Sequence, residues 1–169
     1  MRNIKAGVVG VGHIGNHHAR IYSELPGCEL VAILDGNYSA AEKAASKYGG
    51  KACSSLEEFS ALIDAATVAT PTESHHEIGS HLLRQGKHLL IEKPIADTTE
   101  RAQELASIAH EHDCILQVGH VERFNPALEA LEEQLKNPRF LEVTRLSPYP
   151  NRSMDIGVVL DLIDRKSVV

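Results

Sequence analysis

The chain has little of what marks secreted or membrane-embedded proteins. Its 169 residues include no tryptophan and three widely spaced cysteines, none in a Cys-x-x-Cys pair. Cysteines of this kind are typical of reduced thiols, so we expect a cytoplasmic protein without a disulfide framework. No apolar run approaches the roughly 18 residues that a membrane helix needs. The N-terminal apolar stretch is short and broken by glycines, which is not typical of a signal peptide.

Positive charge is also scarce. The formal net charge is −6, which argues against nucleic acid or an anionic membrane as a partner. Ten histidines include the doublets His17-His18 and His75-His76. Neighbouring residues on a helix point about 100° apart, and no cluster of Cys, His and carboxylate residues has the spacing of metal ligands. We therefore expect no metal site.

Apolar runs alternate with helical segments along the first 120 residues. This alternation is typical of βαβ units, so we predict an α/β fold, a Rossmann-type doubly wound parallel sheet. The predicted strands are 4–9, 30–34, 65–69, 88–91 and 115–118. The predicted helices are 14–25, 39–48, a brief helix capped by Ser55, 72–85 and 98–112.

The pattern changes near residue 120. A helix predicted at 126–135 and a strand beginning at 140–145 are followed by a loop-like stretch rich in proline. We predict a first domain at 1–120 and, at 121–169, the start of a second domain that the sequence does not complete.

A glycine-rich segment follows the first predicted strand. Residues 10–15 read Gly-Val-Gly-His-Ile-Gly, and G-x-G-x-x-G between a strand and a helix is typical of dinucleotide binding. The first glycine permits a tight turn, the second lets a pyrophosphate approach, and the third lets the helix pack on the strand. The N–H groups that open the helix then bind the phosphates. The predicted cofactor-binding residues here are Gly10, Gly12, His13, Ile14 and Gly15.

Asp35 follows Gly15 by twenty residues and ends the second predicted strand. A carboxylate at this position accepts hydrogen bonds from ribose hydroxyls and repels a 2′-phosphate, which favours NAD over NADP. The alternative, a structural glycine turn beside a solvated aspartate, stays open.

The stretch His88–Asp97 places Glu92-Lys93-Pro94 directly after an apolar strand. Ligands bind at the carboxyl ends of the strands in such sheets. We therefore expect a crevice near the nicotinamide, lined by Thr70, Pro71, His75, Glu92 and Lys93. A lysine in a partly desolvated crevice can take the proton of a substrate hydroxyl while hydride leaves the carbon.

Together, GVVGVGHIG, VAILD, VATPTESH, IEKPIA and VGHVERFNPA resemble the glucose–fructose oxidoreductase, inositol dehydrogenase and MocA-like family. The resemblance runs from about residue 3 to about residue 162. It implies a nicotinamide-binding domain, a C-terminal α/β substrate domain that usually forms the oligomer interface, and a catalytic role for Lys93. Asp161 matches the family's second catalytic position.

Within that family, the segment 118–126 and the sequence RLSPYPNRSMDIGVVLDL are most similar to dehydrogenases that act on C3 of UDP-N-acetylglucosamine. The resemblance implies a sugar-nucleotide substrate and a role in lipid A or surface polysaccharide assembly. It suggests His120, Arg123 and Asn125 as substrate-binding residues. An arginine here can pair with a substrate phosphate, or lie solvated on the surface.

The chain departs from the family pattern at its end. Four residues after Asp161, Arg165 stands where the family has a catalytic histidine. We expect that the sequence stops before its substrate domain closes. Two functions follow: an NAD-dependent dehydrogenase of sugar nucleotides, or a non-catalytic NAD-binding module. A third reading, a ligand-sensing regulator, lacks a basic or helix-turn-helix segment.

Overall fold

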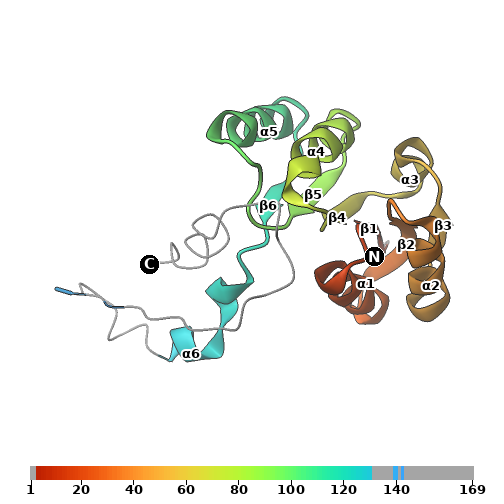
Figure 1. Cartoon of the computed structure of the whole chain (residues 1–169), viewed down its shortest axis with the longest axis horizontal. Coiled ribbons are helices and arrows are strands. Elements are labelled where there is room, and N and C mark those ends of the chain that lie inside the picture. The colour runs from red at the N-terminus through yellow and green to blue at the C-terminus, as the bar shows by residue number, and fades with distance from the viewer. Residues whose placement is uncertain (1–2, 131–138, 141, 143–169) are drawn as a thin grey trace. The chain divides into compact units, whose positions relative to one another are not determined.

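The computed structural model describes residues 3–130, 139–140 and 142 (Figure 1). The chain divides into two units, Met1–Gly119 and His120–Val169, and each is described by itself. The strands of the first unit are β1 (Ile4–Val9), β2 (Cys28–Leu34), β3 (Lys51–Cys53), β4 (Ala65–Val68), β5 (His88–Ile91) and β6 (Leu116–Val118). Its helices are α1 (His13–Glu24), α2 (Tyr38–Tyr48), α3 (Leu56–Leu62), α4 (His75–Arg84) and α5 (Thr99–Glu111), with a 3₁₀ turn, η1, at Thr72–Ser74.

The six strands form one sheet in the order β3-β2-β1-β4-β5-β6, and every pair is parallel. The chain builds β1, β2 and β3 in one direction and then crosses back to place β4 on the other side of β1. This is the doubly wound arrangement, so the predicted fold class is confirmed.

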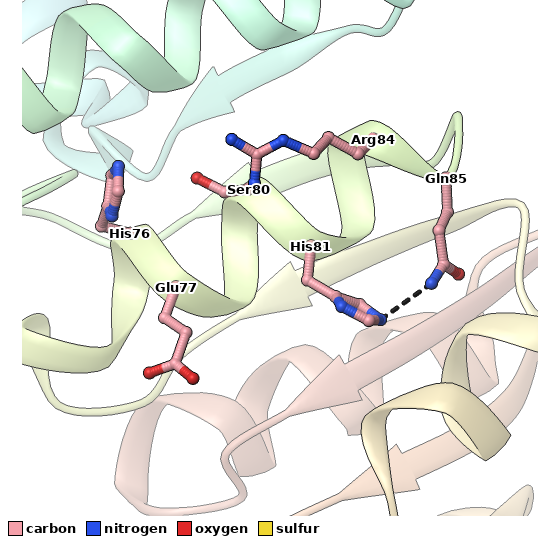
Figure 2. A pocket seen from close by; sticks show the side chains of 6 residues that line it. All are labelled: His76, Glu77, Ser80, His81, Arg84 and Gln85. Atoms are coloured by element: carbon pink, nitrogen blue, oxygen red, sulfur yellow. Dashed lines mark hydrogen bonds between the residues drawn. The ribbon is translucent and has the colours of Figure 1, made fainter.

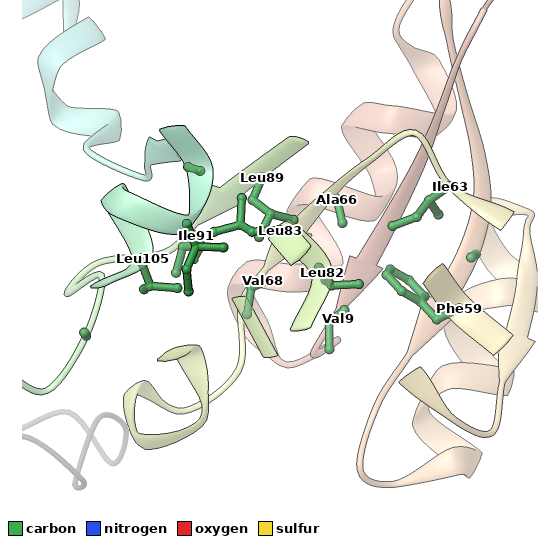
Figure 3. Close-up of a cluster of buried hydrophobic side chains, with 14 of the residues drawn as sticks. Val9, Phe59, Ile63, Ala66, Val68, Leu82, Leu83, Leu89, Ile91 and Leu105 are labelled. Carbon is green, nitrogen blue, oxygen red and sulfur yellow. The ribbon is translucent and has the colours of Figure 1, made fainter. Parts of the chain in front are cut away.

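Side chains of opposite parity along the central strands pack into two separate cores. Val8 and Ile33 lie in the cluster beneath α1 and α2, whereas Val9 and Ala32 lie in the larger cluster on the other face. Figure 3 shows that larger cluster extending from Leu105 of α5 to Phe59 of α3. The sheet is therefore buried on both faces, which explains why its strands read as continuous apolar runs.

Two helix starts follow their sequence signals, and one element was missed. Ser55 and Thr98 accept hydrogen bonds from the backbone N–H three residues on and cap α3 and α5. β3 was not predicted, because an edge strand of three residues that begins with an exposed lysine gives no apolar run. The predicted helix 72–85 is split into η1 and α4.

In the second unit the structure describes a 3₁₀ turn, η2 (Val121–Phe124), and α6 (Pro126–Glu129). The rest of the helix predicted at 126–135 lies outside the described residues, apart from Ala130. Of the predicted strand 140–145, only Phe140 and Glu142 are described, and Asp161 and Arg165 are not. Within the described ranges, no helix is long and apolar enough to cross a membrane.

Glu58 of α3 joins β3 to the helix cap. Its carboxylate lies 2.6 Å from Lys51 Nζ and accepts from the Ser54 N–H at 2.8 Å. The hydrogen bond from Lys51, followed by those from Ser54, lowers the pKa of Glu58 to about 2. The ionised Glu58 carboxylate therefore stabilises the fold above the unfolded pKa of about 4.3, and this contribution is lost as the pH falls toward 2.

We expect Glu58→Gln to flatten the acid limb of a Tm-against-pH curve. An unchanged acid limb would contradict this role.

Candidate functional site

The glycine loop and the residues that follow β4 and β5 meet where the parallel strands end. We call this side, formed by the carboxyl ends of the strands, the carboxyl edge of the sheet; the side where the strands begin is the opposite edge. β1, which leads into the loop, pairs with β2 on one side and β4 on the other, and β5 lies next to β4. A Cβ built on Gly10 would lie 2.9 Å from the Thr70 side chain, so the loop and the end of β4 are in contact. This edge is the topological switch point, where doubly wound sheets bind their ligands.

The three glycines of the loop differ in what surrounds them. Gly10 has φ +85°, and a Cβ on Gly15 would lie 1.7 Å from the Gly10 carbonyl oxygen. Gly12, in contrast, caps α1 without a side-chain hydrogen bond, and among the residues that the structure describes none beyond its chain neighbours comes within 4 Å of its Cβ position. The start of α1 is thus an open cradle of backbone N–H groups, including those of His13 and Ile14. It fits a dinucleotide pyrophosphate.

Asp35 and Asn16 fix the conformation of this loop. Asp35 Oδ2 accepts from the Val11 N–H at 2.7 Å, and its Oδ1 accepts from the Asn37 N–H at 2.8 Å. The Asn16 amide donates to the carbonyl oxygens of Val11 and Gly12. Asn16 was not among the predicted site residues. Its position one residue beyond the motif is the signal that could have found it, since an amide there can reach back to the loop carbonyls.

The end of β4 is held by short-range hydrogen bonds. The Ser74 hydroxyl lies 2.8 Å from both Thr70 Oγ1 and the Pro71 carbonyl oxygen. His75, predicted to bind cofactor, has a relative exposure of 1%. Its Nδ1 lies 2.9 Å from the Pro94 carbonyl oxygen and its Nε2 lies 2.8 Å from that of Thr70. The imidazole therefore bridges the ends of β4 and β5 instead of facing open space.

The end of β5 places Glu92 beside α1. Glu92 Oε1 lies 2.9 Å from His18 Nε2, and both side chains are mostly buried. The Lys93–Pro94 peptide bond is cis. Sequence reasoning did not predict the His18 contact, because the two residues are 74 positions apart. Of the predicted residues, the structure thus brings Thr70, His75, Glu92 and Lys93 to the edge that carries the glycine loop.

The suggested substrate-binding residues belong to the second unit, where His120 precedes η2. Arg123 is exposed. Asn125 is engaged locally: its amide donates to Glu122 at 2.9 Å, and its Oδ1 accepts from the Ala127 N–H at 3.0 Å. The Arg123 side chain is therefore exposed, whereas that of Asn125 is held within its own turn.

A hollow of about 450 Å³ lies over α4 and contains none of these residues. Figure 2 shows its lining side chains along that single helix, with the Gln85 amide near His81. The Ser80 hydroxyl there is buried and finds no hydrogen-bond partner within the part of the chain that the structure describes. Glu104 lies 2.9 Å from His76 Nε2 and 3.4 Å from Arg84 Nη2, so its carboxylate offsets the charge of Arg84. Across the described ranges, no three His, Cys, Asp or Glu side chains come together to hold a metal.

Comparison with known proteins gives the same assignment of cofactor. The chain is 36% identical over 164 residues to UDP-N-acetylglucosamine 3-dehydrogenase of Acidithiobacillus ferrooxidans, covering 96% of this chain and 52% of that protein. A crystal form of that enzyme superposes with a TM-score of 0.87, covering 95% of this chain and 53% of the other. Inositol 2-dehydrogenase of Rhizobium meliloti is 33% identical, with coverage of 83% and 43%. GenD2 from gentamicin A biosynthesis, solved in complex with NAD, has a TM-score of 0.76 at 27% identity, with coverage of 79% and 39%.

The chain spans about half the length of the curated relatives it matches. A family model described as an oxidoreductase family with an NAD-binding Rossmann fold matches residues 4–120. That match covers most of the chain and coincides with the six-stranded unit and its glycine loop. The chain therefore belongs to the Gfo/Idh/MocA family of oxidoreductases and carries its NAD-binding Rossmann domain.

Proposed function

We propose that the protein oxidises a sugar hydroxyl with NAD, and that its substrate is UDP-N-acetylglucosamine, oxidised at C3. One observation carries the proposal: Lys93 follows β5 at the same sheet edge as the glycine loop. The 36% identity to a UDP-N-acetylglucosamine 3-dehydrogenase supports the choice of substrate.

The residues of the chain divide the chemistry between them. The backbone N–H groups at the start of α1 would hold the pyrophosphate, and Asp35 would receive the adenosine ribose. Bound NAD supplies the hydride acceptor. Lys93 Nζ would take the hydroxyl proton as the hydride leaves C3, so that the carbon becomes a ketone and no charge accumulates on oxygen. Asp161 would assist at the same hydroxyl, and Arg123 would pair with the diphosphate of the substrate.

The test is to incubate the complete polypeptide that carries these 169 residues with NAD and to follow the absorbance of NADH. UDP-N-acetylglucosamine, UDP-glucose and myo-inositol are compared as substrates. We expect UDP-N-acetylglucosamine to give the highest kcat/KM, with a product lighter by two hydrogens. A higher kcat/KM for inositol would contradict the proposed substrate and leave the family assignment intact.

A second candidate is a non-catalytic NAD-binding module. Arg165 favours it, because this residue stands where the family has a catalytic histidine, and a guanidinium stays protonated and cannot act as a base. NADH binding without turnover of any of the three substrates would support this candidate. The family resemblance also predicts that the complete protein forms a homo-oligomer. Light scattering tests this separately.

We expect the chain to bind NADH at least about tenfold more tightly than NADPH, a difference of about 1.4 kcal/mol. The Asp35 carboxylate would lie beside the 2′-phosphate of NADPH and repel it. Asp35→Asn removes the charge and keeps one oxygen for the Val11 N–H, so the preference should shrink while NADH still binds. Fluorescence titration of both nucleotides measures the ratio.

The matched control for that substitution is Asp64→Asn. Asp64 also accepts from a backbone N–H, that of Lys5 at 3.0 Å, but it precedes β4 at the opposite edge of the sheet. This variant should keep the wild-type ratio. Equal affinity of the wild-type chain for NADH and NADPH would refute the role given to Asp35.

A further inference from the structure

The two histidine doublets have the same arrangement on different helices. In each, one histidine turns inward to the Glu92–Pro94 segment and the other turns outward. His18 of α1 contacts Glu92, whereas His17 contacts the ring of His13. His75 of α4 contacts Pro94, whereas His76 contacts Glu104. The residues immediately before and after Lys93 therefore each contact a histidine ring, Glu92 through its carboxylate and Pro94 through its carbonyl oxygen.

On the N-terminal side of Lys93, His18 contacts the Glu92 carboxylate in a mostly buried position. The two side chains have relative exposures of 14% and 13%. Gly119 is packed against the same carboxylate, and a Cβ there would lie 2.8 Å from the Glu92 carboxyl carbon. Glu92 Oε2 also lies 3.3 Å from the Lys93 N–H. A line of contacts thus runs from the helix that opens at the glycine loop to the backbone of Lys93.

The helix that carries His18 is itself fixed on the sheet. The Tyr22 hydroxyl, one turn after His18, pairs with Thr67 Oγ1 of β4. Burial raises the pKa of the Tyr22 phenol, and either of the two hydroxyls can donate this hydrogen bond. Thr67 has a relative exposure of 0%. His18 therefore projects from an anchored helix, as a residue that positions another must.

On the second side, the His75 ring lies between two backbone carbonyl oxygens, that of Pro94 at 2.9 Å from Nδ1 and that of Thr70 at 2.8 Å from Nε2, and its N–H donates to one of them. Because the ring is buried and both nitrogens contact backbone oxygens, its position is fixed by groups at the ends of β4 and β5. The backbone on both sides of Lys93 is thus attached to regular elements: α1 through His18, and α4 and β4 through His75.

We propose that His18 and His75 are positioning residues for Lys93 and hold its backbone so that the amine meets the substrate hydroxyl beside the nicotinamide. This inference rests on the proposed function of Lys93. Catalytic groups lose much of their effect when displaced by about 1 Å, up to roughly 100-fold in rate. Four rotatable bonds separate the lysine amine from its Cα, and any movement of the backbone adds to the freedom that they give the amine. A fixed backbone therefore removes one source of displacement.

The experiment measures acylation of Lys93 by trace acetic anhydride, quantified by mass spectrometry, in the purified chain with and without saturating NADH. In the wild-type chain, NADH should slow acylation of Lys93 by roughly tenfold, because the amine lies beside the bound nicotinamide. His18→Leu should lose most of this protection while its NADH affinity stays within about threefold of wild type. His18→Gln keeps an N–H donor for Glu92 and should recover the protection.

The outer histidines supply matched controls. His17→Leu and His76→Leu change the same residue type on the same helices and should retain full protection. His75→Gln is the second inward variant, and Tm values show whether each variant folds. If His75→Gln unfolds, His18→Leu decides, because its side chain is less deeply buried.

Two failures are distinguishable. Full protection of Lys93 in folded His18→Leu and His75→Gln would overturn the positioning role and leave the function of Lys93 intact. Absence of protection in the wild-type chain would overturn the placement of Lys93 beside the nicotinamide, and the positioning role with it.

Discussion

Lys93→Met should lower kcat for sugar oxidation in the complete polypeptide by roughly 10²- to 10⁴-fold, the usual contribution of general acid–base catalysis. Methionine has nearly the length of lysine but cannot take the hydroxyl proton. NADH affinity should change little, because backbone N–H groups of the glycine loop hold the pyrophosphate. Initial rates with saturating NAD, together with NADH titration, separate the two effects.

Lys87→Met is the matched control for Lys93→Met. Lys87 precedes β5, so the two lysines flank the same strand at opposite edges of the sheet. Lys87 Nζ donates to the Ile63 carbonyl oxygen at 2.8 Å, and its loss should lower stability by about 1 kcal/mol without changing turnover. Turnover of Lys93→Met equal to that of Lys87→Met would refute a catalytic role for Lys93.

Alanine at Gly12 and at Gly15 should give opposite results. At Gly15 the new Cβ would lie 1.7 Å from the Gly10 carbonyl oxygen, a backbone clash that should destabilise the fold by about 3 kcal/mol. For a chain of this length, that corresponds to a fall in Tm of about 10 °C. At Gly12 the Cβ would enter open space with φ −65°, so the Tm should remain near the wild-type value.

The Gly12→Ala variant should nevertheless bind NADH at least about tenfold more weakly, a loss of about 1.4 kcal/mol. The added methyl group occupies the space through which a pyrophosphate approaches the start of α1. Thermal unfolding of the two variants tests the expected loss of stability in Gly15→Ala, and NADH titration tests the expected loss of affinity in Gly12→Ala. Wild-type affinity in Gly12→Ala would show that the phosphates do not bind at this loop.

Much of the fold could be predicted because its signals are local. Pro26 and Gly27 follow the end of α1, Ser55 and Thr98 cap their helices, and buried strands such as 88–91 read as uninterrupted apolar runs. β3 escaped because three residues at a sheet edge carry no periodicity. It pairs with β2 in the folded sheet, and Glu58 of the following helix contacts Lys51.

The arrangement of the strand ends was predictable. Because parallel strands end at one edge, the sequence order alone was enough to bring Thr70 and Lys93 toward the glycine loop. The supporting contacts were not predictable. His18 meets Glu92 across 74 residues, and nothing local distinguishes it from His17. The burial of His75 depends on the Pro94 carbonyl, whose position only the folded loop defines.

We propose that NAD binds at the carboxyl edge of the sheet with its pyrophosphate at the start of α1 and its nicotinamide beside Lys93. The most direct measurement is amide chemical-shift mapping of the ¹⁵N-labelled chain during titration with NAD. We predict the largest shifts for Gly10–Gly15, Asp35, Thr70 and Glu92–Lys93, with none at Gly27, Asp64 or Lys87, which precede strands at the opposite edge. Shifts confined to that opposite edge, or to the hollow of His76, Ser80 and Arg84 over α4, would contradict this binding position of NAD.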